Sequence, residues 1–165
     1  MEKRIPLATP TMHGKELDFI QEAFDKNWIA PLGFNCDSFE NEMSNYLSEG
    51  KENCYALSLN SGTSALHMAV KLAGVKKGDV VLCSDMTFAA TVNPISYEGG
   101  TQVFVDGEEE TWNMDPVALE KAFEKYPNAK VVMLAHLYGT PAKMDEILSI
   151  CNKHGAILIE DAAEA

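Results

Sequence analysis

The fold is decided by residues 130–161, which read KVVMLAHLYGTPAKMDEILSICNKHGAILIED. Two short apolar runs, Lys130–Ala135 and Ala156–Ile159, flank an amphipathic stretch, Pro141–His154, that stops at Gly155. Short apolar runs are typical of buried strands, amphipathic stretches of this length are typical of helices, and glycine is common just past a helix end. The stretch therefore predicts a strand, a helix and a second strand, the repeating unit of a parallel sheet.

The same alternation extends toward the N-terminus. It predicts strands at Tyr55–Leu59, Val80–Cys83 and Gln102–Val105, and helices at Ser64–Ala73 and Asp115–Tyr126. The last of these opens with an aspartate and a proline, residues favoured at the N-cap and at the first helical position. Residues 51–165 are therefore expected to form an α/β domain, a three-layer structure with a mostly parallel sheet flanked by helices.

Residues 1–50 follow a different pattern and are expected to form a separate N-terminal segment. Apolar residues at near-helical spacing predict helices at Glu16–Asn27 and Cys36–Leu47. Between them lies an apolar loop, residues 28–33, punctuated by proline and glycine. Trp28 in this loop either plugs a core or, with Pro31, lines a pocket or a contact between subunits.

Composition excludes several classes of partner. The 165 residues are 46% hydrophobic and carry a formal charge of −12, with a pI near 4.6. This field repels nucleic acid and anionic membrane, so an anionic ligand has to be held by local groups such as a helix N-terminus. The acidic run Glu108–Glu110 is interpreted as a solvated loop.

No targeting, membrane or metal signal is found. The four cysteines share no CxxC spacing and are expected to be reduced thiols, so no metal site is predicted. The first residues resemble no signal peptide, and no apolar run approaches the roughly 20 residues of a membrane span. A cytoplasmic protein is expected.

Candidate ligand-binding residues are expected directly after the predicted strands, because ligands bind at the carboxyl ends of strands in open α/β sheets. Ser61-Gly62-Thr63-Ser64 follows one strand and opens a helix, where free N–H groups and the helix dipole suit a phosphate. A plain N-cap explains the same residues equally well. No P-loop and no GxGxxG fingerprint occurs in the sequence.

Two further strand ends carry Asp161 and Phe88. Asp161 follows an apolar strand, so its carboxylate is expected near the base of the crevice, paired with a cation or capping the next turn. Phe88 either stacks on a flat ring or packs in the core. A phosphate seat, an aromatic ring and a carboxylate at strand ends of one sheet fit pyridoxal 5′-phosphate, whose ring nitrogen has to stay protonated.

Five segments then resemble the DegT/DnrJ/EryC1/StrS sugar aminotransferases, which have the fold of type-I pyridoxal phosphate enzymes. These segments, in the family's order and spacing, are residues 61–67, 87–93, 104–106, 136–139 and 159–163. The resemblance covers essentially the whole chain. It implies a homodimer that transfers an amino group, with glutamate as donor, to a nucleotide-linked 4-keto-6-deoxy sugar.

The resemblance also implies roles for single residues. Gly62, Thr63 and Ser64 would hold the cofactor phosphate, Phe88 would stack on the pyridine ring, and Asp161 would pair with its nitrogen. Glu164 would lie near the phenolic oxygen, where the family more often has Gln or His, so its carboxyl has to be protonated, turned away or paired. Residues 1–50, with Trp28 and Pro31, would form the substrate side. His136 would lie close to it, near the crevice, where a structural hydrogen bond explains this residue at least as well as a catalytic role.

The lysine that forms the Schiff base in this family is expected beyond Ala165, so no catalytic residue is assigned within the chain. The 165 residues are therefore expected to be the N-terminal part of a longer enzyme and to lack activity alone. A histidine in place of that lysine would instead indicate a sugar dehydratase of the same superfamily. A third possibility is a non-catalytic binding or regulatory module.

Overall fold

The computed structural model describes residues 9–48 and 54–165, and they divide into two compact units, Met1–Ser58 and Leu59–Ala165. The predicted boundary between residues 50 and 51 lies outside the described residues. The first unit contains two helices, α1 (Glu16–Asp25) and α2 (Phe34–Leu47). Both were predicted, α1 ending two residues earlier and α2 starting two residues earlier than expected.

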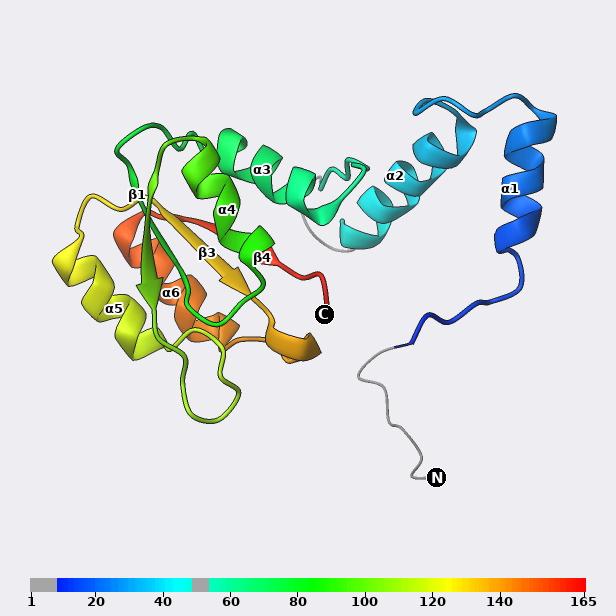
Figure 1. Ribbon diagram of the computed structural model, residues 1–165. Coiled ribbons are helices and arrows are strands. Elements are labelled where there is room, and N and C mark those ends of the chain that lie inside the picture. Colours follow the sequence, from blue (N-terminus) through cyan, green and yellow to red (C-terminus); the bar gives the residue numbers. More distant parts are fainter. Residues whose placement is uncertain (1–8, 49–53) are drawn as a thin grey trace, which may run out of the picture. The chain divides into compact units, whose positions relative to one another are not determined.

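The second unit consists of strands that alternate with helices (Figure 1). Its elements in chain order are α3 (Gly62–Leu72), β1 (Val80–Ser84), α4 (Ala89–Tyr97), β2 (Thr101–Val105), α5 (Pro116–Lys125), β3 (Val131–Ala135), the short 3₁₀ turn η1 (Leu137–Gly139), α6 (Met144–His154) and β4 (Ile157–Asp161). The four strands form one sheet in the order β2-β1-β3-β4, and every neighbouring pair is parallel. All four carboxyl ends therefore lie at the same edge.

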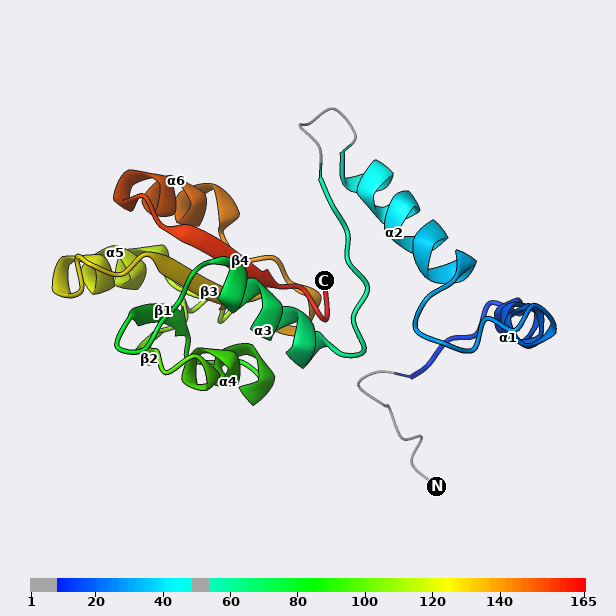
Figure 2. The same cartoon turned by 90° about the horizontal axis from the view of Figure 1, so that it is seen from above.

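Helices cover both faces of this sheet, which confirms the predicted three-layer α/β fold. Figure 2 shows α3 and α4 on one side of the strands and α5 and α6 on the other. Leu82, Val132 and Leu134 pack toward α5 and α6, whereas the alternate residues Val81 and Met133 pack toward α3 and α4. Side chains alternate between the faces of a strand, so continuous apolar runs are required in strands that are buried on both faces.

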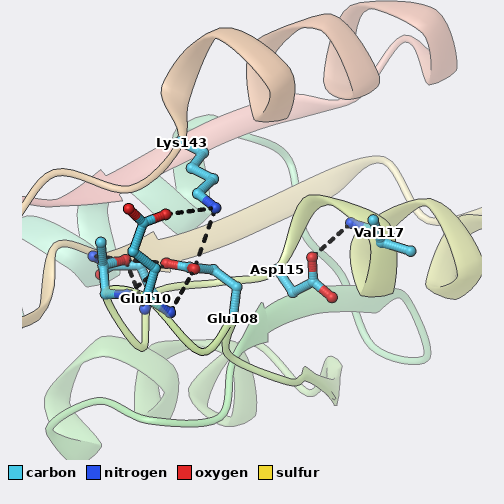
Figure 3. Close-up of polar contacts among 7 residues, drawn as sticks. Glu108, Glu110, Asp115, Val117 and Lys143 are labelled. Carbon is cyan, nitrogen blue, oxygen red and sulfur yellow. Dashed lines mark hydrogen bonds and ion pairs between the residues drawn. The ribbon is translucent and has the colours of Figure 1, made fainter.

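Local sequence signals account for several helix ends. The Asp115 carboxylate accepts a hydrogen bond from the Val117 N–H at 2.9 Å, with Pro116 at the first helical position of α5 (Figure 3). Gly155 closes α6 in the left-handed conformation, with φ 61° and ψ 37°. An αL residue without a Cβ is the expected end of such a helix.

The predicted strand Tyr55–Leu59 is wrong, because this stretch belongs to no strand. Two of its backbone N–H groups donate to side chains of α2 instead of to a neighbouring strand. The Ala56 N–H donates to Ser44 Oγ and the Ser58 N–H donates to Glu40 Oε1, at 2.9 and 2.8 Å. These contacts occupy the donors that a sheet ladder would need.

In the acidic run after β2, Glu109 and Glu110 are exposed as expected, whereas Glu108 is not. Lys143 Nζ lies 3.2 Å from Glu108 and 3.3 Å from Glu110, so the start of α6 is tied to this loop (Figure 3). The Glu108 side chain is only 10% exposed. Its hydrogen bond from the Thr111 hydroxyl, with further bonds from backbone N–H groups and Lys143, lowers the pKa of Glu108 from 4.5 to about 2.

Candidate active site

One cavity of about 640 Å³ lies at the carboxyl edge of the sheet, within the second unit. Its walls come from the start of α3, the segment after β1, the segment after β3 and the end of β4. It brings together six residues that the sequence singled out, namely Gly62, Thr63, Phe88, His136, Asp161 and Glu164. In the sheet, β2 lies on one side of β1, whereas β3 and β4 lie on the other side, so the order of strands reverses between β1 and β3. Open α/β sheets bind ligands at such a reversal point.

The start of α3 forms one end of this cavity. Ser61 is the N-cap, and its hydroxyl oxygen accepts a hydrogen bond from the Ser64 N–H at 3.2 Å. The N–H groups of Gly62 and Thr63 bond to no acceptor among residues 9–48 and 54–165. A Cβ placed on Gly62 would meet nothing within 4 Å, so the backbone there is open to a ligand. Capping and anion binding are thus compatible at this helix start, because they use different N–H groups.

Ser64 differs from its two neighbours. It does not line the cavity, and both its amide and its hydroxyl are bonded to Ser61 Oγ, the hydroxyl at 3.0 Å. A direct contact between Ser64 and a ligand stays a prediction, and the open N–H groups belong to the two residues before it.

Phe88 lies in the cavity wall immediately before α4 and is 82% exposed. Of the two interpretations of this residue, core packing is contradicted by its exposure. An exposed phenylalanine contributes little to stability, because its apolar surface stays in contact with water. A flat ligand ring that stacked on Phe88 would bury this surface.

Asp161 ends β4, and its two carboxylate oxygens have different partners. Oδ2 accepts a hydrogen bond from the Thr91 hydroxyl at 2.5 Å, and Oδ1 accepts one from the Ala163 N–H at 3.2 Å. The second bond is the turn-capping contact that the sequence left open as an alternative. Each carboxylate oxygen can accept more than one donor, so a cationic N–H in the cavity still finds an acceptor here.

Two remaining side chains at the edge already have protein partners. Glu164 Oε2 accepts a hydrogen bond from the Tyr138 N–H at 2.9 Å, which ties the chain end to η1. His136 is buried; its Nδ1 accepts from the Ala142 N–H at 3.1 Å, and its Nε2 lies 3.1 Å from Glu160 Oε2. An accepting Nδ1 places the ring proton on Nε2, facing the carboxylate. Both ring nitrogens of His136 are therefore engaged in holding the fold.

Asn113 is a residue of this region that the sequence did not reveal. It is buried, its side-chain oxygen accepts from the Leu137 N–H at 2.8 Å, and its amide donates to the Thr140 carbonyl at 2.9 Å. These bonds hold both ends of η1, in which Tyr138 has a positive φ of 51°. No motif precedes Asn113, so only the tertiary structure identifies it.

Trp28 and Pro31 belong to the first unit. The ring of Trp28 packs 5.6 Å from that of Phe34, with Lys26 Nζ 4.8 Å from its centroid, and Pro31 is exposed. Their contact with a substrate stays a prediction. In the described part of the chain, no group of three or more His, Cys, Asp and Glu side chains could hold a metal ion, and no helix is long and apolar enough to cross a membrane.

Comparison with known proteins agrees with this geometry. The model of the DegT/DnrJ/EryC1/StrS aminotransferase family matches residues 10–165. The chain belongs to this family. Its fold is part of the type-I fold of the solved family structures.

Individual relatives show how much of their own length the chain spans. The "Putative pyridoxal phosphate-dependent aminotransferase EpsN" of Bacillus subtilis (strain 168) is 47% identical over 169 residues, which is 100% of this chain and 42% of that protein. The GDP-perosamine synthase of Escherichia coli O157:H7 is 36% identical and is matched over 99% of this chain and 43% of its own length. The chain thus spans about two fifths of the curated relatives that it matches.

A solved structure of a related protein shows which cofactor that protein binds. A GDP-4-keto-6-deoxymannose-3-dehydratase with a trapped PLP-glutamate geminal diamine matches with a TM-score of 0.85 at 26% identity, over 98% of this chain and 42% of that one. Members of the family therefore bind pyridoxal phosphate.

Proposed function

We propose that the chain is the N-terminal part of a pyridoxal phosphate-dependent aminotransferase that acts on a nucleotide-linked 4-keto-6-deoxy sugar, with glutamate as the amino donor. The observation that carries this proposal is the placement of the α3 start, Phe88 and Asp161 around one cavity. The aminotransferase relatives support the reaction, and GDP-perosamine synthase supports the substrate class.

The phosphate of the cofactor would bind at the start of α3. The open N–H groups of Gly62 and Thr63 would donate to it, and the helix dipole favours a negative charge at this position. A local site of this kind is needed in a chain whose formal charge is −12.

The ring of the cofactor would lie between Phe88 and the end of β4. Pyridoxal phosphate supplies an electron sink when its ring nitrogen is protonated. The exposed ring of Phe88 would cover one face of the pyridine, and the Asp161 carboxylate would accept the N–H⁺ in a charge-assisted hydrogen bond. Asp161 thus keeps a proton on the ring nitrogen, which is its role in the reaction.

The lysine that attaches the cofactor would come from outside these 165 residues. None of the lysines in the part of the chain that the structure describes lines the cavity. The isolated chain is therefore expected to bind the cofactor without a covalent bond and to show no turnover. The complete enzyme is expected to be a homodimer.

The experiment uses the longer protein that contains this sequence. With pyridoxal phosphate and glutamate, the bound cofactor should change from its aldehyde to its amine form, and one 2-oxoglutarate should be released per site. A nucleotide-linked 4-keto-6-deoxy sugar should then restore the aldehyde form and yield the amino sugar. A cofactor spectrum that does not respond to glutamate would reject the proposal.

The second candidate function is a sugar dehydratase, which the match to the GDP-4-keto-6-deoxymannose-3-dehydratase favours. The same experiment separates the two. An aminotransferase leaves nitrogen from glutamate in the sugar product, whereas a dehydratase consumes the sugar and leaves none there. The sequence of the longer protein also separates them, because a lysine at the position of cofactor attachment indicates an aminotransferase and a histidine there indicates a dehydratase.

A further inference from the structure

A chain of two hydroxyl groups leads from the cavity wall to Asp161. Thr87 Oγ1 lies 2.6 Å from Thr91 Oγ1, and Thr91 Oγ1 lies 2.5 Å from Asp161 Oδ2. Thr87 lines the cavity, whereas Thr91 has an exposed fraction of 0% and does not line it. The three groups come from the segment after β1, the first turn of α4 and the end of β4.

The directions of these hydrogen bonds follow from the number of protons. An ionised carboxylate can only accept, so the single hydroxyl proton of Thr91 is committed to Asp161. Thr91 then has no proton left for Thr87, and Thr87 has to donate to Thr91. The order is Thr87 to Thr91 to Asp161, with every donor pointing toward the carboxylate. Consecutive donors of this kind polarise one another.

We propose that Thr91 is a positioning residue that fixes the Asp161 carboxylate for the ring nitrogen of the cofactor, with Thr87 holding Thr91 in turn. This inference rests on the proposed function. Thr91 is inaccessible to water, so no solvent molecule replaces its hydroxyl when it is removed. Among the residues that the structure describes, the Ala163 N–H would then be the one remaining donor to the Asp161 carboxylate, on the other oxygen, and the carboxylate would be free to turn about that bond.

The short segment from Thr87 to Thr91 connects the proposed stacking ring, Phe88, with the carboxylate of Asp161. Thr87, Phe88 and Thr91 lie within five residues of each other, and the Thr91 N–H donates to the Phe88 carbonyl at 3.0 Å. The turn that presents the stacking ring therefore also sets the carboxylate that faces the ring nitrogen.

The test compares Thr91→Val, which keeps the shape of the side chain and removes the hydroxyl, with Thr91→Ser, which keeps the hydroxyl. Each 165-residue variant is titrated with pyridoxal phosphate and with a carbocyclic analogue in which C–H replaces the ring nitrogen. Thr101→Val is the matched control, since Thr101 is an exposed residue of β2 away from the cavity.

Thr91→Val should weaken the binding of pyridoxal phosphate by about 10-fold or more, the usual effect of losing a hydrogen bond to a charged group. Binding of the carbocyclic analogue should stay within about twofold, because it makes no bond to Asp161. Thr91→Ser should recover most of the affinity, and Thr101→Val should change neither ligand. An equal loss for both ligands, or no loss for either, would overturn the proposal.

Failure of the proposed function gives a different result. In that case the unchanged chain binds neither ligand, and Asp161→Ala has no effect. A measurement without cofactor tests the hydroxyl chain itself: the Thr91 hydroxyl proton should give a slowly exchanging NMR resonance that disappears in Asp161→Ala. A Thr91 hydroxyl proton that exchanges rapidly in the unchanged chain would overturn the hydroxyl chain, and with it the positioning role.

Discussion

The two units contain helices of the same amphipathic kind, yet among residues 9–48 and 54–165 only the second unit has a buried core. Every helix of the second unit places apolar residues in one of two clusters on the faces of the sheet. In the first unit, none of the described residues is buried, and apolar side chains such as Phe24 and Phe39 are more than half exposed.

The difference shows that an apolar stripe predicts a helix without predicting what covers the stripe. Isolated helices of this length are marginal in water, and most helical stability comes from tertiary packing. The second unit supplies that packing through its sheet. The helices of the first unit have apolar stripes, but the described residues of this unit include no surface that buries them.

The largest expected effect comes from separating the units. Residues 59–165 alone should unfold in one cooperative transition, whereas residues 1–58 alone should show no cooperative transition. The sequence has two tryptophans, Trp28 in the first unit and Trp112 in the second, so fluorescence in urea follows each unit separately. A cooperative transition reported by Trp28 in residues 1–58 would show that the first unit has a core of its own.

Next in size are substitutions of a phenylalanine in each unit. Phe123→Ala should lower the free energy of unfolding by about 3–5 kcal/mol, because the side chain is 1% exposed in the cluster under α5 and α6. Phe24→Ala in α1, where the side chain is 65% exposed, should change it by less than about 0.5 kcal/mol. Urea denaturation of the 165-residue chain measures both, with Trp112 following the second unit and Trp28 the first, and equal costs would remove the distinction between the units.

A smaller effect is expected for the polar contacts that hold the site loop. Asn113→Ala should cost about 1–3 kcal/mol, because it leaves the Leu137 N–H and the Thr140 carbonyl without their partner. Asn152→Ala on the exposed side of α6 is the matched control. Hydrogen exchange at the Leu137 amide should rise in the first variant and not in the second. Unchanged protection at Leu137 would show that Asn113 does not hold η1.

The smallest effect is a pH dependence at Glu108. The unfolded carboxyl takes up its proton near pH 4.5, whereas the folded one does so near pH 2. Its stabilising contribution is therefore complete above pH 4.5 and is lost as the pH falls toward 2. Glu108→Gln should lower the melting temperature at neutral pH and by progressively less toward pH 2. Glu109→Gln, an exposed neighbour, should leave the pH profile unchanged.

Local signals explain what the sequence predicted correctly in the fold. Continuous apolar runs located β1 to β4 within two residues, and Asp115-Pro116 and Gly155 marked helix ends. The helix α4 was missed, and it contains Pro94, a residue type that normally interrupts a helix. Burial of that proline with Val92 and Ile95 against the sheet outweighs the lost backbone bond.

The site was predictable to the extent that it follows strand ends. Phe88 and Asp161 could be singled out because Phe88 lies in the short segment after β1 and Asp161 ends β4. Thr91 could not be assigned a role, since its partner Asp161 lies 70 residues away in sequence. Asn113 was missed for the same reason, because its partners lie 24 and 27 residues away.

In the proposed function, the cavity at the carboxyl edge of the sheet holds pyridoxal phosphate by the start of α3, Phe88 and Asp161. Titration of the ¹⁵N-labelled 165-residue chain with pyridoxal phosphate tests it most directly. Saturable shifts are expected that are largest at the amides of Gly62 and Thr63, with further shifts at Phe88 and Asp161. Shifts confined to the α5 and α6 surface, or none at any of these four residues, would contradict it.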